Sequence, residues 1–110
     1  MKRDINLFIS DILESINLIE EYTKNITEEE LSKNKLTQDA IVRRFEIIGE
    51  AVKNIPNNFR DKHTNIPWRE IAGLRDVLIH GYFGVNLIRV WKVIKEDLPK
   101  LKKELLSIKI

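Results

Sequence analysis

Apolar residues recur along this chain at intervals of three and four, a spacing that predicts packed helices and disfavours a sheet. From Asp4 to Lys24 the repeat is continuous, so this segment is expected to form one long amphipathic helix. A second apolar stripe runs from Ala40 to Ile55, and a third begins at Leu87. Pro99 lies inside the third stripe and is expected to kink or break that helix. The chain is therefore predicted to be all-α.

Several helix starts are marked by side chains that can accept hydrogen bonds from free backbone N–H groups. Thr27, followed three residues later by Glu30, has the form of a capping box and predicts a short helix that ends near Lys33. Thr37 is expected to cap the next helix, and Asn86 the last long one.

The segment 56–65 contains proline, asparagine and charges of both signs without an apolar repeat, so it is expected to be a surface loop. Pro67 suits the first position of a helix, which is predicted to run to about His80 or Gly81. A chain of 110 residues has room for one domain. Residues 1–110 are therefore interpreted as a single up-and-down bundle of four to five helices.

The composition argues against several kinds of site. With no cysteine and two histidines, the sequence offers no disulfide and little material for a zinc site, so no metal is expected. No run approaches the roughly 20 apolar residues that span a bilayer, and no signal peptide is recognised, so a cytoplasmic protein is predicted. A net charge of +2 permits binding to nucleic acid without indicating it.

One charged residue interrupts the apolar face of the helix predicted after Pro67. At about 100° per residue, Arg75 falls on the same face as Trp68 and Ile79. A guanidinium on an apolar face is costly unless it is paired or lies at the lip of a cleft. Arg75 is therefore a candidate for binding an anion in a cleft.

His80 lies four residues after Asp76, a spacing that brings two side chains together on a helix. On spacing alone two interpretations stay open, and the structural one is the more common for so short a pattern. In it, the helix dipole and Asp76 stabilise His80 while Arg75 reaches solvent. In the functional one, His80 exchanges protons with an RNA 2′-hydroxyl or the leaving 5′-oxygen, and Arg75 holds the phosphate. RNA supplies its own nucleophile, so such a site needs no metal.

The same helix carries apolar residues on a further side, at Leu74 and Val77. A helix that is apolar almost all round must be covered on more than one face. A second copy of the chain would bring another surface, so a homodimer is predicted.

Three segments resemble the HepT family of the HEPN superfamily. Residues 66–86, which read IPWREIAGLRDVLIHGYFGVN, look like the signature stretch of that family. RFEIIGEAVKNI at 44–55 resembles its central helix, and VWKVIKEDLPKL at 90–101 resembles its last one. Because the three segments occur in the family's order, the chain is identified as a member of it.

The resemblance implies a dimeric all-α HEPN domain in which an Arg-x-x-x-x-His-x-Tyr motif lines a cleft shared by two subunits. By position in that motif, Arg75 and His80 are the catalytic pair, Asp76 is a supporting residue and Tyr82 is the motif tyrosine. It further implies a metal-independent endoribonuclease that acts as the toxin of a toxin–antitoxin pair.

The resemblance also implies a partner, an MntA-type nucleotidyltransferase antitoxin that adenylylates Tyr82. The ATP and magnesium for that reaction are held by the partner, so this chain is expected to need no cofactor. An added AMP would bring a phosphate beside Arg75 and compete with RNA there. Two alternatives stay open: a non-catalytic HEPN module that binds RNA or a nucleotide beside a nucleotidyltransferase, and the acceptor subunit of a two-subunit nucleotidyltransferase.

Overall fold

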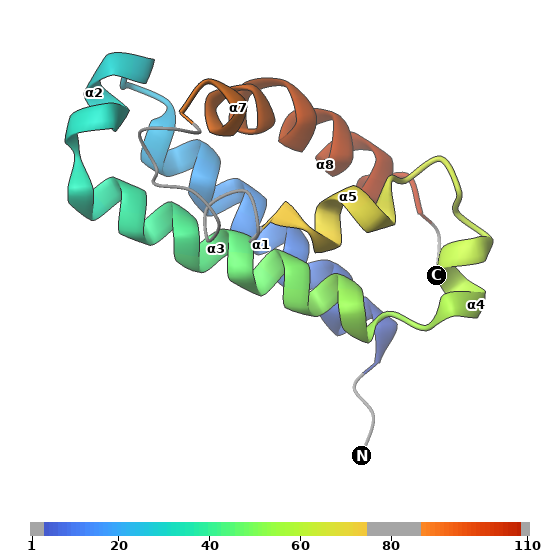
Figure 1. Cartoon of the computed structure of the whole chain (residues 1–110). Helices are drawn as coiled ribbons and strands as arrows, with labels where there is room; N and C mark the ends of the chain where they lie inside the picture. The colour runs from blue at the N-terminus through green and yellow to red at the C-terminus, as the bar shows by residue number, and fades with distance from the viewer. Residues whose placement is uncertain (1–3, 75–86, 109–110) are drawn as a thin grey trace.

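The computed structural model describes residues 4–74 and 87–108, and every regular element within those ranges is a helix. In chain order the elements are α1 (Ile5–Thr23), α2 (Glu28–Lys33), α3 (Lys35–Asn54), α4 (Asn57–Asp61), α5 (Trp68–Ala72), α7 (Leu87–Lys92), the π-helical turn η1 (Val93–Asp97) and α8 (Leu98–Leu106). Figure 1 shows α1, α3, α5 and the α7–α8 arm running in alternating directions. The prediction of an all-α, up-and-down bundle is confirmed for the part of the chain described.

The two long helices α1 and α3 pack against each other and form the centre of the bundle. Their apolar stripes are fully buried at Ile12, Ile16, Phe45 and Ile48, each no more than 1% exposed. Burying a side chain of this size contributes roughly 1.5–3 kcal/mol, so these stripes are the main stabilising contact of the fold. Further helices cover the pair, because α5 packs on α3 and α8 packs on α1.

The turn between α1 and α3 is built from two side-chain caps. The predicted capping box is present: the Thr27 hydroxyl accepts from the Glu30 N–H and the Glu30 carboxylate accepts from the Thr27 N–H, both at 3.1 Å. The predicted cap at Thr37 is wrong. Asn34 caps α3 instead, with its side-chain oxygen 3.0 Å from the Thr37 backbone nitrogen. An asparagine can end one helix and begin the next, and here it does both for α2 and α3.

The segment predicted to be a plain surface loop contains a short helix, α4. Phe59 on this helix is half-buried and its ring lies 4.6 Å from that of His63, which is itself half-buried. This contact explains why five residues fold locally without an apolar repeat.

The helix predicted from Pro67 to about His80 is interrupted. α5 ends at Ala72, and the Gly73 N–H closes its last turn on the Arg69 carbonyl at 3.1 Å. Pro67 is the residue before the helix and not its first residue. The expected continuation from residue 75 onward, and the cap expected at Asn86, lie outside the described residues.

The C-terminal arm contains a π-helical turn immediately before Pro99. In this turn the Leu98 N–H bonds to the Val93 carbonyl, five residues back. Pro99 has no N–H, and its ring would press on the carbonyl four residues earlier, so the widened turn relieves both problems. The helix predicted to kink or break at Pro99 does not break: a π-helical turn precedes the proline and the arm continues as α8. None of the described helices combines the length and apolar character needed to cross a membrane.

Candidate functional site

The candidate site residues Arg75, Asp76, His80 and Tyr82 all lie between 75 and 86, outside the described residues. Whether these four side chains meet therefore stays a prediction. The structure describes the helix before this segment, α5, and the helix after it, α7.

The chain immediately before residues 75–86 is held in place by Trp68 and Leu74. The indole N–H of Trp68 donates to two backbone carbonyls of the preceding turn, at 3.0 Å to His63 and 3.2 Å to Arg60. Trp68 is 7% exposed and Leu74 is 8% exposed, so both belong to the core. The last described residue before the segment is thus anchored on α3 through α5.

Leu74 bears on the argument for a homodimer. Its side chain is covered by its own chain, so it does not call for a second copy. Val77, the other residue in that argument, lies outside the described residues. The described core therefore neither requires nor opposes a dimer.

The chain immediately after residues 75–86 is held in place by α7. Val90 is fully buried, and α7 packs against α2 at the end of the bundle away from the chain termini. The neighbouring Trp91 is half-buried, and the Lys95 ammonium lies 4.8 Å from the centre of its ring. Lys95 also donates to the Thr23 carbonyl at the end of α1, at 3.2 Å. These contacts hold the arm after the segment against α1 and α2.

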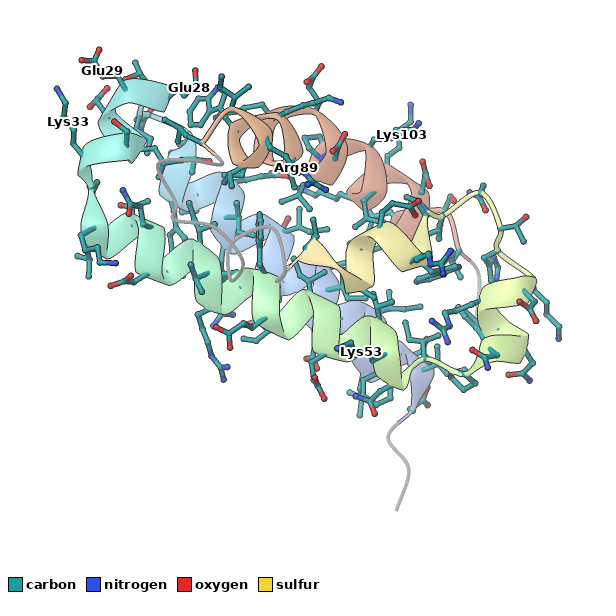
Figure 2. The ribbon with its side chains drawn as sticks, viewed as in Figure 1. Glu28, Glu29, Lys33, Lys53, Arg89 and Lys103 are labelled. Carbon is teal, nitrogen blue, oxygen red and sulfur yellow. The ribbon has the colours of Figure 1, made fainter. Side chains whose placement is uncertain are left out.

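The exposed face of α7 is cationic. Arg89 and Lys92 are both exposed, and among the described residues neither has a hydrogen bond, an ion pair or a ring contact. In Figure 2 Arg89 projects on the side of α7 toward α5, whereas Lys103 of α8 projects away from the bundle. Helix α7 therefore presents unpaired positive charge beside the point where the chain leaves residues 75–86.

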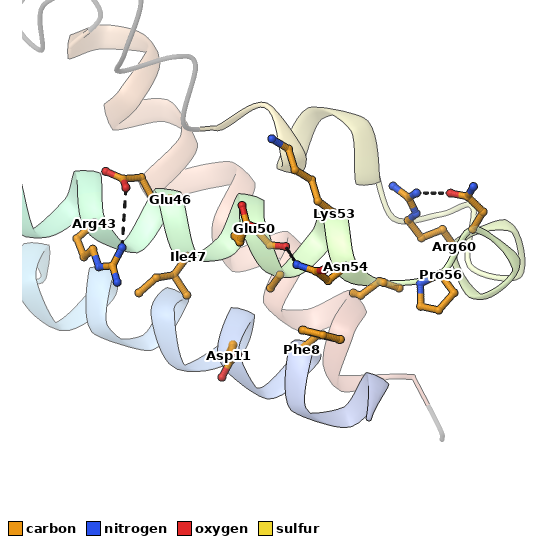
Figure 3. A pocket seen from close by; sticks show the side chains of 13 residues that line it. Phe8, Asp11, Arg43, Glu46, Ile47, Glu50, Lys53, Asn54, Pro56 and Arg60 are labelled. Atoms are coloured by element: carbon orange, nitrogen blue, oxygen red, sulfur yellow. Dashed lines mark hydrogen bonds and ion pairs between the residues drawn. The ribbon is translucent and has the colours of Figure 1, made fainter. Parts of the chain in front are cut away.

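A separate groove of about 1050 Å³ lies between α1, α3 and α4 (Figure 3). Its described lining includes the apolar Phe8 and Ile47 and charges of both signs, such as Glu50 and Lys53. The Nε of Arg60 is buried there without a hydrogen-bond partner, while the terminal guanidinium nitrogen donates to the Asn57 side chain. Because opposite charges are mixed along this groove, it does not favour an anionic ligand over a cationic one.

Within residues 4–74 and 87–108, no group of histidines, cysteines and carboxylates is arranged to hold a metal ion. The helices on either side of residues 75–86 offer cations and hydrogen-bonding side chains, which can bind and orient a phosphate but do not by themselves break a bond. The chemistry of the candidate site would have to come from residues 75–86.

Comparison with known proteins identifies the family to which this chain belongs. The profile of the family described as Ribonuclease HepT-like matches residues 12–108. This chain belongs to that family. No solved structure matches the chain significantly.

Individual relatives agree with the family match. A protein of Thermococcus cleftensis named "Probable ribonuclease HepT" is 54% identical, over 93% of each chain. A Methanocaldococcus jannaschii protein named "Putative RNase" is 52% identical over 94% of each chain. A second protein of that organism, named "Gamma-glutamylcyclotransferase and putative RNase", is 55% identical, but the chain spans 49% of its length.

Arg89 and Lys92 are not among the residues that the sequence analysis singles out. A signal for them exists, because the nine residues from Leu87 to Lys95 contain three cations and no carboxylate. In a chain where 33% of residues are charged, and of both signs, such a stretch is uneven. The exposure that makes two of these cations available is visible only in the structure.

Proposed function

We propose that this chain is a metal-independent endoribonuclease that acts through Arg75 and His80. The observation that carries the proposal is the family match over residues 12–108, together with relatives named as ribonucleases that align over almost their whole length. The sequence also has the family's Arg-x-x-x-x-His-x-Tyr pattern at residues 75–82.

The proposed reaction uses the RNA 2′-hydroxyl as nucleophile. His80 takes the proton of this hydroxyl and returns it to the departing 5′-oxygen, so that no net proton is gained or lost. The 2′-oxygen forms a bond to phosphorus, the bond from phosphorus to the 5′-oxygen breaks, and the products are a 2′,3′-cyclic phosphate and a 5′-hydroxyl. No metal and no covalent enzyme intermediate is needed to balance these steps.

Arg75 and Asp76 have supporting tasks in this proposal. The guanidinium of Arg75 binds the non-bridging oxygens of the phosphate and stabilises the charge that they gain in the transition state. Asp76, four residues before His80, orients the imidazole. Two subunits would bring their motifs together, so the active form is proposed to be a homodimer with a shared cleft.

The activity is proposed to be that of a toxin controlled by a second protein. A nucleotidyltransferase antitoxin would transfer AMP from ATP to the Tyr82 hydroxyl, with release of pyrophosphate. The new phosphate would then occupy Arg75 and exclude RNA. An RNA substrate and an ATP-using partner agree with the cytoplasmic location expected from the sequence.

The test is cleavage of RNA by the purified protein in the presence of a chelator. We expect the wild type to cleave RNA and to slow growth when expressed alone, and we expect His80→Ala and Arg75→Ala to lose both effects. His63→Ala is the matched control, because His63 is the other histidine of the chain and packs on Phe59. This control should retain cleavage.

A wild type that neither cuts RNA with chelator present nor slows growth would overturn the proposal. If it bound RNA without cutting it, the result would favour the non-catalytic HEPN module. Cleavage that persisted in His80→Ala would leave an RNase but would remove His80 from the catalytic role.

A further inference from the structure

The exposed face of α7 carries two cations one helical turn apart, Arg89 and Lys92. Both are exposed and neither has a partner among the described residues. Side chains three apart on a helix start about 5–6 Å from each other, so these two charges repel. No interaction described in the structure compensates for that repulsion.

Several cations on other helices are paired with a carboxylate, although Lys100 and Lys103 of α8 are not paired within the described residues. Lys24, Lys33, Lys35 and Arg43 each lie within 4 Å of a carboxylate one turn along the same helix, at 3.5, 3.3, 3.2 and 3.9 Å respectively. Arg89 has no carboxylate three or four residues away in the sequence, and Glu96, four residues after Lys92, makes no ion pair with it. The positive charge of α7 is thus left open to an external anion.

The backbone that carries this pair is held in place. Val90, between the two cations, is fully buried, and α7 packs on α2 and continues directly into η1. A cation on a fixed helix loses less freedom on binding than one on a loop, so it binds an anion with less entropic cost. The half-buried Trp91 already has Lys95 over its ring, which leaves the phosphate contacts and not base stacking as the role of this face.

We propose that Arg89 and Lys92 are positioning residues that bind successive phosphates of the RNA backbone next to the cleavage motif. The proposal rests on the proposed ribonuclease function and extends it to α7, which begins five residues after Tyr82. The spacing of one helical turn suits neighbouring phosphates of one strand, and Arg89 projects toward the side of α5, the helix that leads into the motif (Figure 2). Arg89 and Lys92 take no part in proton transfer.

The experiment compares two double variants that remove the same charge. Arg89→Ala with Lys92→Ala is the test, and Lys100→Ala with Lys103→Ala is the control. Lys100 and Lys103 are also exposed, also three residues apart and also without a partner among the described residues, but they lie on α8. Binding is measured with a fluorescent single-stranded 2′-O-methyl RNA, which lacks the nucleophile and cannot be cut. Cleavage kinetics use the unmodified RNA of the same sequence.

The test variant should bind about tenfold more weakly near 0.1 M salt and raise KM by a similar factor, with kcat within about twofold of wild type. The slope of log Kd against log salt should fall by about 1.4, because each phosphate contact on a single strand contributes about 0.7. The control should stay within about twofold in every measurement. A charge-preserving variant, Arg89→Lys with Lys92→Arg, should restore the salt slope.

Equal behaviour of the test and control variants would overturn the proposal, as would a wild type that does not bind the 2′-O-methyl RNA. A wild type that binds this RNA but does not cut the unmodified one would overturn the ribonuclease function alone, and the α7 contact would still be judged by the binding data. Unchanged thermal unfolding of both variants excludes a general loss of structure, because all four side chains are exposed.

Discussion

Trp68 is the residue whose hydrogen bonds do most to fix the approach to the candidate site. Its indole N–H is shared between the carbonyls of His63 and Arg60, and its ring lies 6.5 Å from that of Phe59. One side chain therefore ties α5 to α4 and to the turn between them. With 7% of its surface exposed, Trp68 belongs to the core of the bundle.

Replacing Trp68 with Phe keeps an aromatic ring and removes the N–H. We expect the free energy of unfolding to fall by about 1–2 kcal/mol, because two carbonyls lose a donor. Urea unfolding followed by circular dichroism measures this. Trp91→Phe is the control: the Trp91 indole N–H makes no hydrogen bond among the described residues, so its smaller loss comes from the contact with Lys95. Equal losses in the two variants would contradict the account.

Tyr82 carries a prediction about covalent modification. When the chain is co-expressed with a nucleotidyltransferase partner, intact-mass measurement should show the addition of AMP, and Tyr82→Phe should abolish it. Tyr22→Phe is the control, since Tyr22 is the other tyrosine of the chain and is half-buried on α1. An adduct that survives in Tyr82→Phe would place the modification elsewhere.

Single residues could be predicted well where a rule for backbone capping decides and poorly where a side-chain contact in a short segment does. Thr27 and Glu30 are three residues apart, so their capping box could be read directly from the sequence. His63 lies in the segment that was expected to be a surface loop, yet it packs on Phe59, four residues earlier in the chain. Candidate residues such as Arg75 and His80 come from the resemblance and from their spacing, and their geometry stays a prediction.

The junction between α2 and α3 shows that a helix boundary, too, cannot always be predicted from residue type. Asn34 and Thr37 are both acceptable caps by residue type, and they are three residues apart. The choice depends on where α2 ends, because Asn34 also closes α2 with its N–H on the Leu31 carbonyl at 3.3 Å. Leu31 is fully buried, and it is this burial that fixes the position of α2.

A pair of alanine variants tests this assignment. Asn34→Ala should lower the free energy of unfolding by about 1 kcal/mol, because the Thr37 N–H loses its acceptor. Thr37→Ala should change it by less than about 0.5 kcal/mol, because its hydroxyl caps nothing. Thermal unfolding of the two variants gives the comparison. A larger effect of Thr37→Ala would return the cap to the residue expected from the sequence.

Long helices were predictable because one apolar stripe decides them, as in α1 and α3. The short helix α2 was predictable from its capping box, whereas α4 was not. The five residues of α4 have no stripe, and their fold depends on the Phe59 contacts. The interruption at Gly73 could not be predicted, because the apolar pattern continues across it. The irregularity near Pro99 could be predicted, because proline lacks the N–H that a regular helix needs.

At the scale of the whole molecule, the described bundle buries its core within one chain. Residues from all the long helices contribute to one apolar cluster. A second copy is therefore not needed to complete this core, and the reason to expect one is the shared cleft of the proposed ribonuclease. Dimerisation would serve the site and not the stability of the described fold.

Size-exclusion chromatography with light scattering should give twice the 13.0 kDa of the chain at micromolar concentration. Because the core formed by residues 4–74 and 87–108 is buried in one copy, dilution should separate the subunits before the bundle unfolds, and cleavage activity should fall with the dimer. Circular dichroism over the same dilution series is the internal control. A protein that remained fully active as a monomer would contradict the shared cleft.

The π-helical turn before Pro99 also sets a rule for chain length in this arm. It accommodates one more residue than an α-helical path would, and each residue of an α-helix turns the chain by about 100°. Removing one residue between 93 and 97 should let the arm relax into a regular helix and leave α7 facing nearly as before, because the widened turn absorbs the extra residue. Val90 should then stay buried, and Arg89 and Lys92 should stay exposed. A deletion at a regular α-helical position of the arm has no extra residue to remove, so it would turn one part of the arm by about 100° relative to the other and expose Val90.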